Sequence, residues 1–80
     1  MPIYVLCDEH SQAECRHVFA AWYGFDSPLR RRTTLGACLL GTHRLFWTVR
    51  AADVHTALEL LPAYVAERTD ALEVRTVLIP

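Results

Sequence analysis

The segment CDEHSQAECRH, residues 7–17, places two cysteines, two histidines and three carboxylates within eleven positions. Thiolates, imidazoles and carboxylates bind transition metals, and a thiolate can also act as a nucleophile. A metal site requires three or four such ligands that converge on one point. The segment therefore raises two chemical hypotheses, a metal site and a reactive thiol, beside a plain strand-to-helix junction.

Ser11 and Glu14 have the spacing of a capping box, which predicts that a helix begins here. The apolar residues of this helix recur with helical spacing at Cys15, Val18, Phe19 and Trp22. On a helical wheel, His17 lies about 200° from Cys15. The two side chains therefore cannot bind the same ion, and we expect Cys15 in the core and His17 in solvent.

Cys7 and His10 form a C-x-x-H pair, but the segment supplies no second pair to complete a metal site. We place Cys7 at the end of a strand and just before a helix, where the helix dipole stabilises a thiolate. The negative charges of Asp8 and Glu9 oppose that effect. The sequence accordingly predicts no metal and no other cofactor, and a metal or thiol sensor at residues 7–17, built on Cys7 and His10, remains an alternative hypothesis.

Two further groups of residues could do chemistry. His43 lies beside Arg44 in a predicted turn, and histidine is the usual acid or base near neutral pH. The run of arginines at positions 30–32 could bind a phosphate or a carboxylate, although such runs are also typical of solvated loops. We predict His43 as a catalytic residue, and as substrate-binding residues we predict Arg75, Tyr64, Trp22 and Arg44.

Composition limits the classes of protein that fit. Eighty residues form one domain, 1–80, and a hydrophobic content of 52% is high for so small a domain, so we expect a partner subunit. The net charge of −1 does not favour nucleic acid. Three cysteines and no recognisable secretion signal predict a reducing, cytoplasmic location, and no apolar run predicts a membrane span.

The elements that must position these residues follow from periodicity. Strands are predicted at residues 2–7, 35–41, 44–49 and 71–79, the middle two forming a hairpin. Helices are predicted after Ser11 and after Asp53, the second with a break at Leu61–Pro62. The order β-α-β-β-α-β predicts an α+β, ferredoxin-like fold, in which a four-stranded antiparallel sheet carries two helices on one face.

Both faces of the predicted sheet are apolar. The first strand carries Ile3 and Val5 on one side and Tyr4 and Leu6 on the other. One face packs against the helices, and the other needs a cover that the monomer does not supply. A second copy packed sheet against sheet would provide it, which predicts a homodimer or larger homo-oligomer of the α+β barrel type.

The segment LLGTHRLFWTVRAADVHTALELLPAYVAERTDALEVRTVLIP, residues 39–80, resembles the end of muconolactone isomerase-like proteins of the dimeric α+β barrel superfamily. The similar features are a strand ending in Gly41, a returning strand with aromatics, a helix running into Leu61–Pro62 and a last strand. The resemblance implies a ferredoxin-like subunit, an oligomer and a cavity that supports proton transfer without metal or nucleotide. The Arg-Tyr pair of those isomerases is replaced here by Thr42 and His43.

These observations leave two principal hypotheses about function. The chain binds a small organic molecule and moves a proton on it, with His43 as the acid or base and arginines as the anion partner. Alternatively, the chain is a non-catalytic module whose apolar sheet face serves assembly or partner binding.

Overall fold

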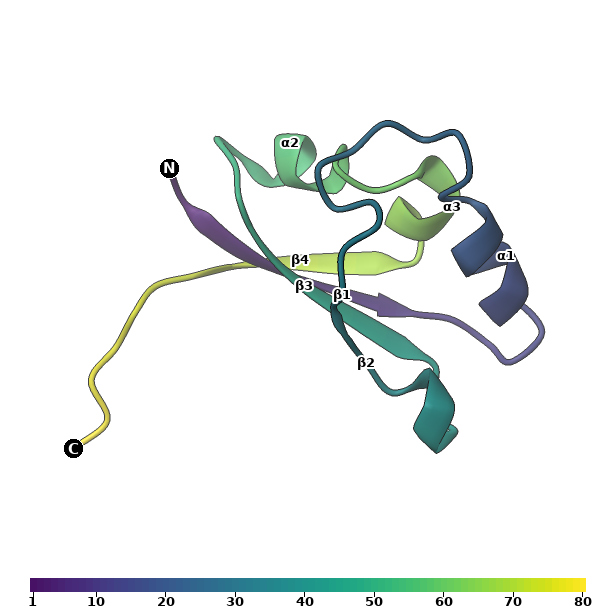
Figure 1. The fold of residues 1–80 in the computed structure, drawn as a ribbon. Helices are drawn as coiled ribbons and strands as arrows, with labels where there is room; N and C mark the ends of the chain where they lie inside the picture. Colours follow the sequence, from purple (N-terminus) through teal and green to yellow (C-terminus); the bar gives the residue numbers. More distant parts are fainter.

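The computed structural model describes residues 1–80 as an α+β fold, a four-stranded antiparallel sheet with short helices on one face (Figure 1). The strands are β1 (Ile3–Glu9), β2 (Leu35–Gly36), β3 (Arg44–Arg50) and β4 (Thr69–Val74). Their order across the sheet is β2-β3-β1-β4. The strand β1 is therefore central, and it pairs antiparallel with β3 on one side and β4 on the other.

The helices are short. They are α1 (Cys15–Ala20), α2 (Val54–Leu58), α3 (Ala63–Ala66) and a 3-10 helix, η1 (Cys38–Leu40). The Thr56 backbone N–H donates to the Asp53 carboxylate at 2.8 Å, which confirms the predicted cap of α2. The predicted break at Leu61–Pro62 is also confirmed, since Pro62 stands immediately before α3 and cannot continue the preceding turn.

The predicted strand at residues 35–41 is too long. Only Leu35 and Gly36 pair with β3, and the chain then folds into η1 and ends it at Gly41, which has a φ of 92°. The backbone N–H groups of Leu40 and Thr42 both donate to the Ala37 carbonyl. The apolar run at residues 38–40 therefore closes into a turn instead of continuing the strand ladder.

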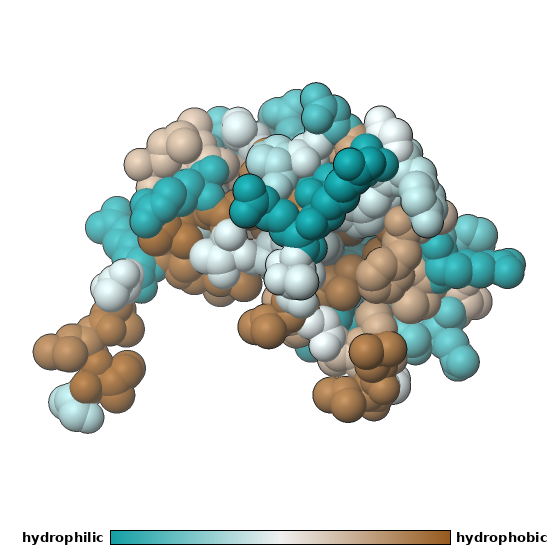
Figure 2. Space-filling model, in the orientation of Figure 1, coloured by the Kyte–Doolittle hydropathy of each residue, from teal (hydrophilic) through white to brown (hydrophobic).

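The predicted bounds of the first and last strands also change. The first strand continues beyond Cys7 to Glu9, because Glu9 lies opposite Arg44 of β3. Cys7 therefore lies within a strand and not at its end. The last strand begins at Thr69 and ends at Val74, opposite Ile3, where β1 has no earlier residue to pair. Residues 75–80 extend away from the body (Figures 1 and 2).

The core lies between the helices and one face of the sheet. Leu6 of β1, Val18 of α1 and Val65 of α3 are fully buried there. Burial alternates along β1 and β3, as expected for strands that have one packed face. The opposite face, which bears Ile3, Val5, Cys7 and Phe46, is only partly buried.

None of the helices combines the length and the apolar character that crossing a bilayer requires.

Candidate metal centre

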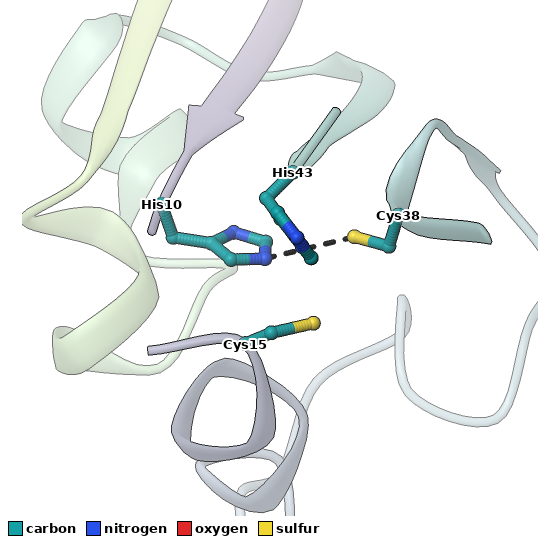
Figure 3. Close-up of side chains that lie close together, drawn as sticks. All are labelled: His10, Cys15, Cys38 and His43. Atoms are coloured by element: carbon teal, nitrogen blue, oxygen red, sulfur yellow. Dashed lines mark hydrogen bonds between the residues drawn. The ribbon is translucent and has the colours of Figure 1, made fainter. Parts of the chain in front are cut away.

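Four side chains with metal-binding atoms converge at one end of the sheet. They are His10, Cys15, Cys38 and His43, and one ligand atom from each lies within 4.8 Å of all the others. Figure 3 shows the four side chains directed toward one another from separate parts of the backbone. Two thiols and two imidazoles are a ligand set typical of tetrahedral zinc sites.

Each ligand stands at the boundary of an element. His10 follows β1, Cys15 begins α1, Cys38 begins η1 and His43 precedes β3. The His10 backbone N–H donates to the His43 carbonyl at 3.0 Å, which fixes the two histidines side by side. The antiparallel pairing of β1 with β3 thus brings the first ligand next to the last.

The predicted capping box sets the position of Cys15. The Ser11 backbone N–H donates to a Glu14 carboxylate oxygen at 2.9 Å, and the Glu14 backbone N–H donates to the Ser11 hydroxyl at 3.2 Å. These two bonds hold the turn between β1 and α1. Arg68 secures the same turn from the other side, because its guanidinium donates to Glu14 at 2.9 Å.

The spacing of the ligand atoms can be compared with a tetrahedral zinc site. Zn–S and Zn–N bonds of about 2.3 and 2.05 Å imply ligand separations of about 3.6 Å for N to S and about 3.8 Å for S to S. The Cys38 Sγ to His10 Nε2 distance is 3.6 Å. The widest separation, up to 4.8 Å, exceeds the tetrahedral values by about 1 Å. A small inward movement of side chains would therefore close the site.

A buried carboxylate orients His10. The His10 Nδ1 atom lies 2.5 Å from Asp8 Oδ2, and neither side chain is exposed to solvent. Burial raises the pKa of Asp8, whereas the hydrogen bond from His10 lowers it. With Nδ1 committed to Asp8, Nε2 is directed at the cluster. A carboxylate behind the metal-binding histidine is the usual outer partner of zinc sites.

The other ligands are also suited to a cation. Burial and the neighbouring Cys15 thiol raise the pKa of Cys38, so two adjacent thiolates need a positive partner. A divalent ion supplies that charge and displaces the thiol protons. His43 Nδ1 is buried and makes no hydrogen bond, so this ring is not fully committed to other protein groups.

Two open hollows adjoin the centre. An open hollow of about 470 Å³ is lined only by polar and charged residues, among them His10, His43 and Arg44. A second hollow contacts Cys15 and His43. Cys15 and His43 are therefore in part open to solution, whereas the His10 side chain is fully buried.

The structure brings together only some of the residues that the sequence singled out. His10 and His43 lie in the centre, and Arg44 lies beside it, ion-paired with Glu9 at 2.5 Å. Cys7 is on the opposite face of the sheet from Asp8. His17 is exposed as predicted, and it packs beside Tyr64, whose ring lies 3.7 Å from the Arg68 guanidinium carbon.

Trp22 and Arg75 lie apart from this group. The Trp22 ring packs 5.8 Å from the Trp47 ring, on the side of the sheet that the helices cover. Arg75 follows the end of β4 and lines a hollow with the N-terminal residues of the chain. The predicted substrate-binding residues therefore do not line one common pocket.

Sequence reasoning placed Cys15 in the core beside Phe19 and did not consider Cys38. In the structure Phe19 is 52% exposed, and Cys15 is directed at the cluster. A signal was present, because the ligands form two pairs, His10 with Cys15 and Cys38 with His43, each five positions apart. The second pair mirrors the order of the first, and a search limited to residues 7–17 misses it.

No protein-family model matches the chain, and neither the curated proteins nor the solved structures give a significant match.

Proposed function

We propose that this chain is a transition-metal-binding domain that holds one zinc ion through His10, Cys15, Cys38 and His43. The observation that carries the proposal is the convergence of these four ligand atoms from two distant chain segments, residues 10–15 and 38–43. Thiolate and imidazole together favour zinc over magnesium or calcium, which take oxygen ligands.

The ligand count favours a structural role for the ion. Four protein ligands fill a tetrahedral shell and leave no open position for water or substrate. The ion would join the turn between β1 and α1 to the connection between β2 and β3. Leu39 and Leu40 of η1 are almost fully exposed, so packing contributes little to that connection.

The test is metal content after reconstitution under reducing conditions. We expect one zinc ion per chain, and cobalt substitution should give the visible bands of tetrahedral Co²⁺ together with a thiolate charge-transfer band. Cys15→Ala and Cys38→Ala should remove most of the bound metal. Cys7→Ala is the matched control, because this third cysteine lies on the far face of the sheet.

Two results would refute the zinc proposal. One is a reconstituted chain that retains no zinc after gel filtration. The other is equal metal loss in Cys7→Ala and Cys38→Ala, which would show that binding does not depend on the cluster.

A second candidate function is cofactor-free proton transfer, as in the isomerase-like resemblance. Its support is the polar hollow that brings His43 and Arg44 together with Glu9 and Glu14. A histidine flanked by carboxylates and an arginine suits acid–base work on a small anion. Turnover of muconolactone by chelator-treated protein, abolished in His43→Ala, would favour this function over the zinc centre.

For assembly, we propose the ferredoxin-like α+β barrel arrangement with a second copy packed on the open sheet face. That face carries apolar Val5 and Phe46 in its middle and Ile3 at one end. Both signs of charge stand around them, with Arg50 at one end and Asp70 on β4. Two copies related by a twofold axis could therefore be self-complementary.

Free thiols at the centre fit a reducing compartment such as the cytoplasm.

A further inference from the structure

A second site lies between α1, the loop of residues 25–34 and β3. It is a pocket of about 190 Å³ that shares no residue with the hollows at the metal centre. Its lining residues are aromatic, aliphatic and basic, namely Phe19, Trp22, Leu29, Arg30, Arg31, Arg32, Thr34, Leu45 and Trp47. No acidic residue is among them.

The floor of the pocket is aromatic. The rings of Trp22 and Trp47 lie 5.8 Å apart at an interplanar angle of 44°. Trp47 is 8% exposed and Leu45 is 6% exposed, so both are fixed in the core. Phe19 is 52% exposed at the rim and has apolar surface to offer a ligand. A planar ring inserted here would contact indole faces and edges.

The rim of the pocket is positively charged. Arg30, Arg31 and Arg32 form no ion pair with any carboxylate of the chain, in contrast to Arg44 and Arg68. In Figure 2 this loop forms a hydrophilic band across the side of the molecule on which the helices lie. Three unpaired guanidiniums beside an apolar floor suit a ligand that carries a ring and an anionic group.

The loop is held in place at both ends. The Ser27 hydroxyl donates to the Leu60 carbonyl at 2.7 Å and accepts from the Leu29 backbone N–H at 3.2 Å. The Thr34 hydroxyl donates to the Phe46 carbonyl. Between these anchors lies Arg31, which has a φ of 64° and is the only residue of the chain other than glycine with a positive φ. Such a conformation is disfavoured for a side-chain-bearing residue and is often found at ligand sites.

We propose that this pocket binds a small aromatic carboxylate, with the ring on the tryptophans and the carboxylate on the arginines. The volume is below the usual range for drug-sized ligands, about 300–1,000 Å³, so a single ring is the appropriate size. The carboxylate accepts charge-assisted hydrogen bonds from one or two guanidiniums. This site is independent of the zinc proposal, because the two share no residue.

The test uses the zinc-reconstituted full chain and benzoate as the probe. Titration is followed by calorimetry and by the fluorescence of the two tryptophans. Benzamide retains the ring without the charge, cyclohexanecarboxylate retains the charge without the aromatic ring, and inorganic phosphate is an anion without a ring. We expect saturable benzoate binding that is about tenfold or more tighter than that of each comparison compound.

Two variants distinguish binding in the pocket from nonspecific attraction of benzoate to positive charge. The triple variant Arg30→Gln, Arg31→Gln, Arg32→Gln should weaken benzoate binding by at least about tenfold while the circular dichroism spectrum stays unchanged. Arg50→Gln removes a charge from the open sheet face and should leave the affinity unaltered. Equal binding of benzoate and benzamide, a triple variant with wild-type affinity, or no saturable benzoate binding would overturn the proposal.

Discussion

At the scale of single residues, the centre depends on which nitrogen each histidine presents. His10 has its Nδ1 bonded to buried Asp8 and its Nε2 near Cys38. The carboxylate therefore selects the orientation of the imidazole and raises its basicity toward a metal. Asp8 is fully buried and its Oδ1 atom makes no hydrogen bond, so His10 is the one hydrogen-bond partner of its carboxylate.

The substitution Asp8→Asn tests this role. The amide can still accept a hydrogen bond from His10 but lacks the negative charge, so we expect zinc affinity to fall by roughly 10–100-fold. Competition with a chromophoric chelator measures the change. Asp70→Asn, an exposed change on β4, is the control. If both variants bind zinc equally well, Asp8 does not support the centre.

The ligands show what sequence could and could not supply at this scale. His10 and His43 were recognisable as chemically useful, and the capping box at Ser11 and Glu14 was readable from spacing alone. The convergence of Cys15 with Cys38 could not be predicted from spacing, because it depends on where η1 turns the chain. Helical periodicity assigns Cys15 to an apolar stripe, whereas its position at the very start of α1 leaves it free to face the cluster.

At the scale of elements, the four strands and the two helical regions followed from pattern, whereas η1 and the bounds of the elements did not. Alternation and capping located β1, β3 and α2, and Pro62 located the break between α2 and α3. The limits of β4 were set by its partner, since Val74 pairs with the first residue of β1. Such limits are tertiary, because a strand ends where its neighbour does.

The cap of α2 makes stability depend on pH. The Thr56 backbone N–H lowers the pKa of Asp53 below its ordinary value. A carboxylate with a lower pKa in the folded state stabilises the fold fully above the unfolded-state pKa of about 3.9, and that stabilisation is lost as the pH falls through the folded-state pKa. Asp53→Ala should therefore lower the melting temperature at pH 7 and have a diminishing effect in acid.

Thermal melts of the wild type and the variant from pH 7 to pH 2 measure this difference. Asp26→Ala, in the loop before Pro28, is the comparison, because Asp26 caps no helix. If the difference in melting temperature between the wild type and Asp53→Ala stays constant down to pH 2, the charge of Asp53 contributes nothing to stability.

At the scale of the whole molecule, zinc would contribute a large part of the stability of so small a domain. An ion that binds only the folded state stabilises that state by about 2.7 kcal/mol when its free concentration is a hundred times its dissociation constant. For a domain of this size that corresponds to a rise in melting temperature on the order of 10 °C. We expect chelator treatment to lower the melting temperature by that amount. Cys38→Ala should melt at the same temperature with or without chelator.

The open sheet face leads to a prediction about assembly. Leu72 of β4 is 66% exposed and lies opposite Val5 on that face. If a second copy covers it, Leu72→Glu should convert a dimer to a monomer in sedimentation velocity. Val54→Glu, at an exposed position at the start of α2, should leave the dimer intact. A wild-type chain that sediments as a monomer at all concentrations would contradict the sheet-to-sheet arrangement.

The central place of β1 has a consequence for amide hydrogen exchange. Because β1 is bonded to β3 and β4 along both edges, its amides should exchange only when the sheet opens as a whole. The segment that contains η1 has no such support and should exchange through local opening. Filling the centre would therefore slow exchange around Cys38 far more than along β1. Zinc would in this way remove the difference in protection between the strand that ends just before His10 and the turn that carries Cys38.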